Sequence, residues 1–255
     1  MTSPLTIARE RDGQLLRLTL ATPKANIVDA AMISALDGAL TEAAEDPHLH
    51  AVLLDHEGPH FSFGASVTEH LPDQCAEMLA SLHALVMKMV AYPVPILVAI
   101  KGQCLGGGLE VAAAGHLLFA APDAKLGQPE IVLGVFAPAA SCLLPERMGS
   151  PQAEDLLYSG RSIDGEEAHR TGLVNSLAEE PAEAALAYFD KHLAPHSASS
   201  LRLAVRAVRS DMVERVRAKL DKVEALYLNE LMATRDAVAG LNAFLEKRSP
   251  KWEDQ

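Results

Sequence analysis

The sequence is poor in cysteine and in basic residues. Its three cysteines, Cys75, Cys104 and Cys142, are odd in number, widely spaced and include no CxxC pair. That pattern argues against both a disulfide framework and a zinc site, and it favours reduced thiols. The 22 lysines and arginines are outnumbered by 34 acidic residues, which gives a net charge of −12. Such a charge argues against nonspecific binding to nucleic acid or to an anionic membrane surface.

Long apolar runs are also missing. Every apolar stretch is interrupted well before 18 residues, so no transmembrane helix is expected. The first residues, MTSPLTIARERDG, carry charges where a signal peptide needs an apolar segment, and we expect a cytoplasmic protein. At 255 residues, with 49% hydrophobic and 22% charged residues, the chain can bury a sizeable core as one large domain, alone or with an appendage.

Two familiar ligand motifs are absent or misleading. The stretch CLGGGLE fits neither GxGxxG nor GxxxxGK[ST], which excludes these nucleotide-binding interpretations. His56-Glu57-Gly58-Pro59-His60 matches the letters of HExxH, but that zinc motif needs a helix to place both histidines on one face. A proline in a helix interior costs about 3 kcal/mol. No metal site is therefore expected, and other histidines, such as His48 and His50, are expected at the surface.

The first half of the chain reads as alternating strands and helices. A hairpin is predicted over 5–20 with its turn at Asp12-Gly13, and 23–26 forms a loop. Asp29 is positioned to cap a helix that reaches about Glu45. Further predicted strands are 51–55, 96–100 and 116–120, and further helices are 72–92 and 109–114, the former with a buried stripe of Met78, Leu82, Leu85 and Met89.

The second half becomes wholly helical. Helices are predicted over 137–148, over 151–158 with Ser150 as cap, and from Asp164 to Gly172, followed by a strand at Leu173-Val174. Beyond residue 181 the predicted helices are 181–194, 198–210, 211–235 and 236–248. The change of character near residue 195 divides the chain into a mixed core, 1–195, in which a loose β-β-α rhythm recurs, and a helical region, 196–255.

The segment from Ile96 to Glu130 carries the chemistry. A buried strand runs into Gly106-Gly107-Gly108, whose amides are unshielded at the N-terminus of the next helix. The free N–H donors and the positive end of the helix dipole favour developing negative charge. Glu110 lies in the first turn, and Glu130 follows a later turn. Taken singly, the glycines could form a tight connection, Glu110 could complement the helix dipole and Glu130 could cap a turn. Together they offer an oxyanion site and two carboxylates for proton transfer.

Four motifs in order make the chain resemble the crotonase (enoyl-CoA hydratase/isomerase) superfamily from end to end. They are Phe61-Ser62-Phe63-Gly64-Ala65-Ser66, Gly106-Gly107-Gly108-Leu109-Glu110, Gln128-Pro129-Glu130 and Ala243-Phe244-Leu245-Glu246-Lys247-Arg248. The resemblance implies an α/β fold: a spiral of ββα units in residues 1–195, followed by a C-terminal helical trimerisation region in 196–255 that completes the coenzyme A site.

The resemblance also assigns the site. It implies that Glu110 and Glu130 are catalytic and that the amides of Ala65 and Gly107 form the oxyanion hole. It implies that Phe244 and Lys247 reach the coenzyme A held by a neighbouring subunit in a trimer or hexamer. No cofactor is implied, because coenzyme A is part of the substrate. The remaining residues expected at the substrate or coenzyme A are Lys24, Ala25, Gly64, Ser66 and Phe136.

Two departures from the family pattern bear on the substrate. Ser66 stands where an acidic residue usually follows the oxyanion alanine, and Val135–Ser141 replaces a glycine-rich segment beside the acyl pocket. The stretches FSFGAS, CLGGGLEVAAAG, QPEIVLGVFAPAAS and LYSGRSIDG are most similar to members that add water to cyclic dienoyl-CoA thioesters in anaerobic benzoyl-CoA degradation. The alternatives left open are a general enoyl-CoA hydratase, a ring-opening acyl-CoA hydrolase and an RNA-binding homologue.

Overall fold

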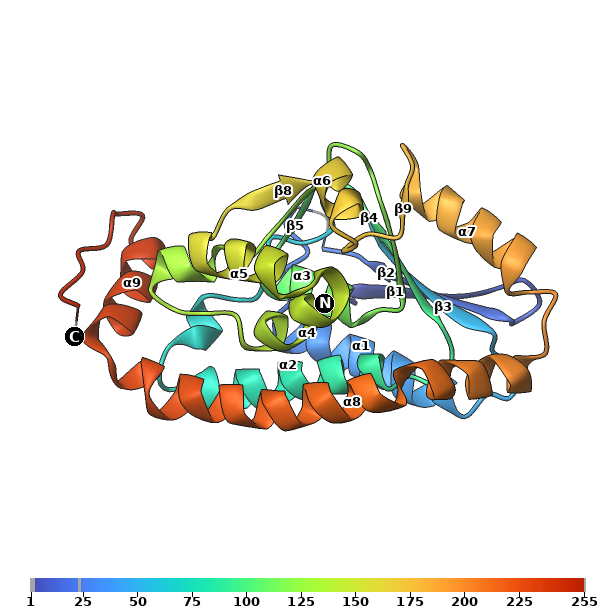
Figure 1. Ribbon diagram of the computed structural model, residues 1–255, viewed down its shortest axis with the longest axis horizontal. Helices are drawn as coiled ribbons and strands as arrows, with labels where there is room; N and C mark the ends of the chain where they lie inside the picture. Colours follow the sequence, from blue (N-terminus) through green and yellow to red (C-terminus); the bar gives the residue numbers. More distant parts are fainter. Residues whose placement is uncertain (1–2, 23, 255) are drawn as a thin grey trace.

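A six-stranded sheet forms the centre of the molecule (Figure 1). The computed structural model describes residues 3–22 and 24–254, so Pro23 of the predicted loop lies outside the described residues. The strands lie in the order β1-β2-β3-β4-β6-β9, with β1 and β2 antiparallel and the later neighbours parallel. Their bounds are β1 Leu5–Glu10, β2 Leu15–Leu20, β3 Ala51–His56, β4 Ile96–Ile100, β6 Leu117–Ala120 and β9 Ser176–Leu177.

Both faces of this sheet are covered by helices because its central strands are apolar on both sides. Leu53 of β3 and Leu97 of β4 pack with Phe189 of α7 (Pro181–His192) in one buried cluster. The residues that alternate with them, such as Val52 and Val98, belong to the larger cluster that includes α1 (Ala30–Ala44) and α2 (Cys75–Val90). Alternate strand residues point to opposite faces, which accounts for the two clusters.

A second, three-stranded sheet is built from short strands that the sequence did not reveal. It has the order β5-β7-β8, with β5 Gln103–Leu105, β7 Lys125–Gly127 and β8 Ser162–Asp164. β5 and β7 are parallel, while β8 is antiparallel to β7. The helix α3 (Gly107–Ala114) follows β5, and the 3-10 helix η2 (Pro129–Leu133) follows β7. Strands of three residues are too short to show periodicity, so β7 was not predicted before the turn that precedes Glu130.

The longest helix lies along the base of the molecule beneath α2 and α4 (Figure 1). The expectation of separate helices over 198–210 and 211–235 was wrong, because α8 runs unbroken from Ala198 to Asn229. Ser210 and Asp211 suggest a break, but both side chains face solvent, and the buried stripe of Val216, Leu220 and Tyr227 continues the line from Arg209. The remaining helical elements are η1 Thr68–His70, α4 Pro138–Met148, α5 Ser150–Ser159, α6 Gly165–Arg170, η3 Leu231–Ala233 and α9 Arg235–Leu245.

Several boundaries are confirmed and others shift. The hairpin of β1 and β2 is present, and the Asp29 side chain caps α1 by accepting a hydrogen bond from the Met32 amide at 2.9 Å. The strand expected at 173–174 instead lies at 176–177, because the Asn175 side chain already accepts from the Leu118 amide. The cap of α5 is Gly149, since Ser150 is itself helical. α2 begins at Cys75 and not at residue 72.

Arg147 and Arg209 join the C-terminal end of α3 to α4 and α8. Arg147 donates to the carbonyl of Ala113 at 2.6 Å and to that of Gly115. Arg209 donates to the carbonyls of Ala114 at 3.2 Å and Gly115 at 2.5 Å. These carbonyls have no further partner in the helix, so the guanidinium groups satisfy them in the interior. The C-terminal helix α8 is thereby anchored to the helix that follows the glycine turn.

Two further expectations concern cysteines and membrane spans. Cys75, Cys104 and Cys142 are free thiols, and all three are buried. Within the described ranges, no helix combines the length and the apolar character that crossing a bilayer requires.

Candidate active site

Two loops meet at the N-terminus of α3. The 61–64 segment runs alongside β5, where the Ser62 amide donates to the Gln103 carbonyl at 2.9 Å and the Leu105 amide donates to the Ser62 carbonyl at 3.0 Å. A β-carbon on Gly107 would lie 2.8 Å from that of Ala65, and one on Gly108 would lie 2.5 Å from that of Ser62. No side chain fits at either position, so glycine is required for the loops to approach this closely.

The contact leaves two backbone amides side by side. A β-carbon on Gly107 would lie 3.0 Å from the Ala65 nitrogen, so the two residues are in direct contact. In the part of the chain that the structure describes, neither the Ala65 nor the Gly107 amide donates to another group. Gly107 is the first residue of α3, where an amide has no intrahelical acceptor. The pair is suited to bind an oxyanion, with the α3 dipole adding favourable potential.

Glu110 lies one turn into α3 and is almost completely buried. Its Oε1 accepts a hydrogen bond of 2.8 Å from the Ala140 amide, in the first turn of α4. Burial raises the pKa of Glu110, while the amides of Ala140 and Ala139 and the charge of His83 oppose that rise. Glu110 is therefore a carboxylate whose ionised form is stabilised by the N-terminal end of a second helix.

The three-stranded sheet positions Glu130 beside the glycine turn at the start of α3. β7 is parallel to β5, and the Gly106 amide donates to the Gly127 carbonyl at 3.0 Å, so α3 and η2 start from the same edge. Glu130 Oε1 lies 2.5 Å from where a Gly106 β-carbon would be. Burial raises the pKa of Glu130 to about 8, and the charge of Glu110 adds to the effect. When the pair holds one proton, that proton resides on Glu130.

The Gln128 side chain lies against the Glu130 carboxyl. Its amide group is 2.9 and 3.2 Å from the two carboxyl oxygens, and with its nitrogen toward them it donates to both. Gln128 is 1% exposed, so its orientation is constrained by the surrounding backbone. The amide thus orients Glu130 toward the glycine turn.

A cavity of about 600 Å³ opens beside these groups. Its wall is mostly apolar, with Ile27, Phe63, Leu105, Val132 and Leu133 among the lining residues. The polar groups that line it include Ser66, Thr68, His70 and Glu130. An apolar chamber with few polar groups is the usual form of a small-molecule site.

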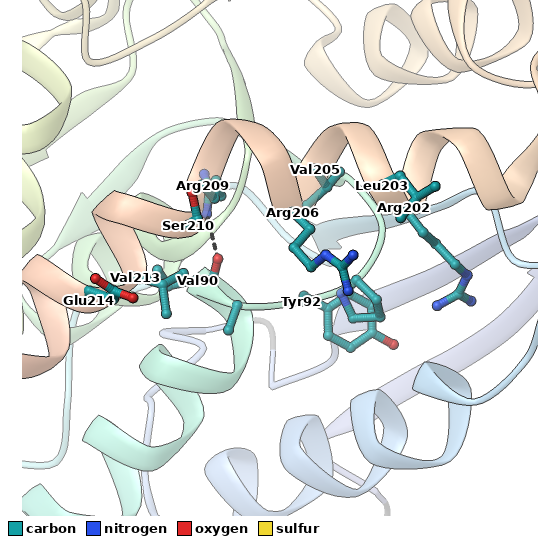
Figure 2. Close-up of a pocket in the computed structure, with 12 residues that line it drawn as sticks. Val90, Tyr92, Arg202, Leu203, Val205, Arg206, Arg209, Ser210, Val213 and Glu214 are labelled. Atoms are coloured by element: carbon teal, nitrogen blue, oxygen red, sulfur yellow. Dashed lines mark hydrogen bonds between the residues drawn. The ribbon is translucent and has the colours of Figure 1, made fainter.

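A second cavity, of about 390 Å³, lies between α8 and the end of α2 (Figure 2). It is lined by Tyr92, Arg202, Arg206 and Arg209 among others, and Glu214 is its one acidic residue within the described chain. It lies away from the glycine turn and holds no carboxylate pair. The candidate chemistry therefore belongs to the larger cavity.

Most of the residues expected at the site come together. Gly64, Ala65, Ser66, Glu130 and Phe244 line the cavity. Gly107 is not a lining residue but contacts Ala65, and Glu110 lies three residues further along α3. Phe136 does not line the cavity: its ring packs edge-to-face on Tyr227, with centroids 5.2 Å apart. Lys24 and Ala25 lie outside the cavity as well, and the Ala25 carbonyl accepts from the Phe63 amide at 2.9 Å.

The C-terminal motif lies at the mouth of the cavity. Phe244, on α9, lines the cavity of its own chain together with Leu241 and Leu245. The resemblance had placed it at a neighbouring subunit, a role that the single chain does not test. Lys247 is exposed and follows the end of α9, where its positive φ of 54° turns the chain away from the helix.

The histidines differ from expectation. His50 is buried, not at the surface, because its ring contacts the carbonyls of His48 and His196. His70 was not predicted at the site, since a 3-10 helix of three residues has no sequence signature. Its Nδ1 donates to the Ser66 carbonyl at 2.8 Å, which leaves Nε2 as the acceptor, and burial lowers the pKa of His70.

The HExxH letters have a structural explanation. His56 ends a strand, and its Nε2 accepts from the Lys101 amide at 3.2 Å. His60 Nδ1 accepts from the Gln103 amide at 3.1 Å. Both rings support the turn between β4 and β5. His56 lies at the end of a strand and His60 lies in a loop, whereas the zinc motif requires both histidines on one helix.

Comparisons with known proteins identify the family and the fold. A sequence model described as "Enoyl-CoA hydratase/isomerase" matches residues 10–255. A cyclohexa-1,5-dienecarbonyl-CoA hydratase of Thauera aromatica is 71% identical over 99% of this chain and 98% of that protein. A probable enoyl-CoA hydratase of Bacillus subtilis (strain 168) is 34% identical over 93% of this chain and 95% of that protein. The crystal structure of an enoyl-CoA hydratase from Mycobacterium avium superposes with a TM-score of 0.87 at 27% identity, covering 99% of this chain and 100% of that one. The expected fold is confirmed.

Because its pKa is raised, Glu130 should make the free energy of unfolding depend on pH. The folded-state pKa of about 8 exceeds the ordinary 4.5, so the folded protein holds a proton that the unfolded chain releases. The free energy of unfolding that this proton contributes is fully present below pH 4.5 and is lost as the pH rises through 8. Its slope is at most about 1.4 kcal/mol per pH unit.

We expect the free energy of unfolding of Glu130→Gln to depend less on pH and to exceed that of the wild type above pH 8. Urea unfolding from pH 5 to 9 measures it. The exposed Glu154→Gln is the control, and parallel curves for wild type and Glu130→Gln would contradict the assignment.

Proposed function

The chain belongs to the enoyl-CoA hydratase/isomerase family, and from that premise we propose that it hydrates cyclohexa-1,5-diene-1-carbonyl-CoA to 6-hydroxycyclohex-1-ene-1-carbonyl-CoA. The observation that carries the proposal is the 71% identity to the Thauera aromatica hydratase over nearly the whole of both chains. The substitution of Val135–Ser141 for a glycine-rich segment supports a substrate other than a linear acyl chain.

The amides of Ala65 and Gly107 stabilise the charge that this reaction creates. Attack of water on the β-carbon moves negative charge through the conjugated system onto the thioester oxygen. Two preorganised donors at that oxygen bind it more tightly in the transition state than in the ground state. Removing one such donor in other enzymes costs about 2.7–4 kcal/mol.

The two carboxylates divide the proton transfers. Glu110, whose ionised form accepts a hydrogen bond from the N-terminal end of α4, takes a proton from the attacking water. Glu130, protonated at neutral pH, delivers its proton to the far end of the diene. The result is a 1,4-addition of water. The hydroxyl group of water bonds to the β-carbon and a proton bonds to the remote carbon, so the substrate gains one water without net oxidation or reduction, and coenzyme A enters as part of the substrate.

Loss of either carboxyl group should reduce turnover sharply. Glu110→Gln and Glu130→Gln keep the side-chain shape but cannot accept or deliver the proton, and we expect each to lower kcat by at least about 10²-fold. Steady-state hydration of the cyclic dienoyl-CoA is the measurement, with circular dichroism to show that the fold survives. Near-normal turnover in either variant would remove that residue from the mechanism.

The position of the new C–H bond distinguishes the proposed reaction from ordinary enoyl-CoA hydration. In D₂O, protonation at the remote carbon places deuterium across the ring from the hydroxyl group, and NMR of the product locates it. An ordinary hydratase protonates the carbon next to the thioester. Deuterium at that carbon, or faster turnover of crotonyl-CoA than of the cyclic diene, would favour the general enoyl-CoA hydratase.

Residues 196–255 complete the proposed enzyme by self-association. Leu226, Phe244 and Trp252 are 43%, 52% and 45% exposed, an apolar surface that a neighbouring subunit could cover. Leu231, which we also expected in this surface, instead packs partly against the core. By resemblance we propose a trimer or a dimer of trimers, with Lys247 near the phosphates of coenzyme A.

Lys247→Ala tests the coenzyme A contact. An electrostatic contact remote from the reacting carbons contributes equally to the ground state and the transition state, so KM should rise with little change in kcat. Lys251→Ala, an exposed lysine four residues along, is the matched control. An unchanged KM would remove Lys247 from the site, and light scattering that shows an active monomer would contradict the assembly.

A further inference from the structure

The short helix that carries Glu130 has little support from the core. None of the five residues of η2 is fully buried, and Ile131 and Val132 are 41% and 56% exposed. Elements with few buried contacts open more readily than the core does. In the proposed reaction Glu130 delivers a proton to one carbon of the substrate ring, so the position of η2 has to be fixed in another way.

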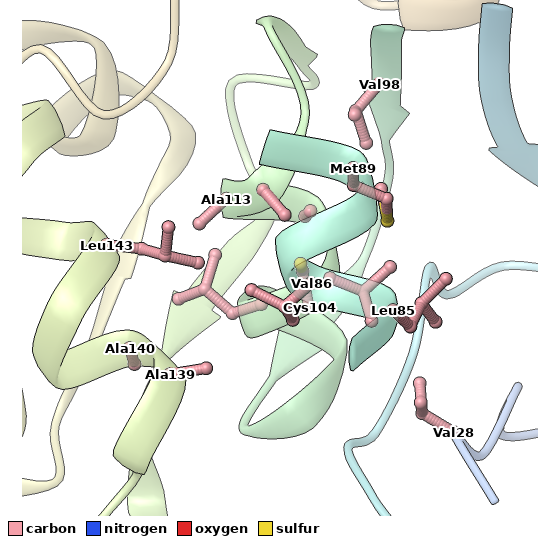
Figure 3. Close-up of a cluster of buried hydrophobic side chains, with 14 of the residues drawn as sticks. Val28, Leu85, Val86, Met89, Val98, Cys104, Ala113, Ala139, Ala140 and Leu143 are labelled. Carbon is pink, nitrogen blue, oxygen red and sulfur yellow. The ribbon is translucent and has the colours of Figure 1, made fainter. Parts of the chain in front are cut away.

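The surroundings of Glu110 are different. Its hydrogen-bond donor, Ala140, belongs to the main apolar cluster. Figure 3 shows Ala140 of α4, Ala113 of α3 and Val86 of α2 in that cluster. Close packing of three helices therefore holds this part of the site. Among the apolar residues of η2, only Leu133 packs against the same cluster.

The helix α9 lies against η2 in direct backbone contact. A β-carbon on Gly240 of α9 would lie 2.1 Å from the Leu133 carbonyl oxygen. A β-carbon on Gly134, the residue after η2, would lie 2.9 Å from the Asp236 carbonyl oxygen. Neither position leaves room for a side chain. Both α9 and η2 contribute residues to the wall of the larger cavity, so their contact forms one corner of that cavity.

One indole ring covers both of these glycines. The β-carbon on Gly134 would lie 3.0 Å from Cζ3 of Trp252, and that on Gly240 would lie 3.0 Å from its Cη2. The same edge of the ring thus contacts α9 and the end of η2, although Trp252 as a whole is 45% exposed. Because an aromatic ring carries a large apolar area, this contact stabilises the two segments against each other.

The C-terminal tail that carries Trp252 is bound to the start of α9. The Asp236 carboxylate accepts hydrogen bonds of 2.8 Å from the amides of Glu253 and Asp254. Hydrogen bonds to an ionised acceptor are stronger than those between neutral groups. Arg235 and Glu253 add an ion pair at 3.2 Å, but both side chains are exposed and such pairs contribute little. Asp236 and Trp252 are therefore the main contacts of the tail.

We propose that Trp252 is a positioning residue for the reaction: its ring clamps α9 to η2 and thereby holds the Glu130 carboxyl group at the substrate ring. The role rests on the proposed function, in which Glu130 delivers the proton. Trp252 is not one of the residues that line the cavity, so it acts through η2 and does not touch the reacting carbons.

Loss of this ring should admit water to Glu130. Burial is the largest cause of the raised pKa of Glu130, and the charge of Glu110 is the one charge among the described residues that adds to it. A looser corner reduces the burial, so the pKa of Glu130 falls from about 8 toward its ordinary 4.5. Since Glu130 must be protonated to act, kcat then declines at a lower pH than in the wild type.

The pH dependence of kcat for the cyclic dienoyl-CoA tests the clamp. In Trp252→Ala we expect kcat at pH 7 to fall by at least about 10-fold, because small displacements of a reacting group are costly. We expect the alkaline limb of the profile to move down by about one pH unit, a tenfold change in proton affinity. Trp252→Phe, which keeps an aromatic ring, should retain the wild-type limb. A smaller folded fraction would lower kcat without moving the limb.

Asp236→Ala releases the tail while the ring stays in the chain. Trp252 is the one tryptophan in the sequence, so a red shift of its fluorescence reports the release. We expect that red shift together with the lower limb. Lys251→Ala, at the exposed neighbour of Trp252, should change neither. A wild-type limb in Trp252→Ala, or a released tail with an unmoved limb in Asp236→Ala, would overturn the clamp. A changed mass in light scattering with a wild-type limb would assign the ring to assembly instead.

Urea unfolding from pH 5 to 9 separates the clamp from the proposed function, because it needs no substrate. The pH dependence that Glu130 gives to the free energy of unfolding should be smaller in Trp252→Ala than in the wild type. An unchanged pH dependence in that variant would overturn the clamp. A wild type that fails to hydrate the diene would instead overturn the proposed function.

Discussion

The close backbone contact between the 62–65 loop and the Gly106–Gly108 turn is the constraint on which the rest of the structure depends. A β-carbon on either Gly107 or Gly108 would clash with the opposing loop, so the contact exists only because both residues are glycine. The contact sets two free amides side by side at the start of α3. The short sheet of β5 and β7 then aligns a second chain segment with the same edge, and Glu130 arrives beside Gly106. The proposed oxyanion site and the carboxyl group of Glu130 are therefore positioned by the same backbone turn.

Two helix N-termini give the site its electrostatic asymmetry. The start of α3 favours negative charge at the thioester oxygen, and the start of α4 favours it on Glu110 through the Ala140 amide. Burial of Glu130, together with the charge of Glu110, favours the neutral form of its carboxyl group even though the Gln128 amide donates to it. When these two carboxyl groups share one proton, Glu130 is therefore the one that holds it. At the far end of α3, Arg147 and Arg209 satisfy the last carbonyls, so both ends of this short helix are stabilised.

α8 belongs to the proposed assembly region and also packs against the core of its own chain. Its exposed residues belong to the proposed assembly region, while its buried stripe contacts the core behind the site. Arg209 binds the end of α3, Glu224 binds His83, and Tyr227 packs on Phe136. Phe136 therefore supports the wall of the cavity from behind, whereas Val135 lines it. A helix that composition alone marks as an appendage is continuous with the interior that surrounds Glu110.

The sequence by itself determined the central strands, the cap of α1 and the glycine turn before α3, because each depends on local properties: apolar runs in β3 and β4, Asp29 at the start of α1, glycines before α3. The local pattern also placed Glu110 in the first turn after the glycines and Glu130 after a later turn, and the family motifs added Ala65. Only the tertiary structure decided how these parts combine. Three-residue strands such as β5 and β7 have no detectable periodicity, yet their parallel pairing brings Glu110 and Glu130 together. His70 and His83 carry no local signature, and each becomes significant only through partners from other parts of the fold, the cavity wall for His70 and Glu224 for His83. Local patterns decide secondary structure, whereas burial and proximity across the fold decide which polar groups are paired, which are left unpaired and which hold a proton.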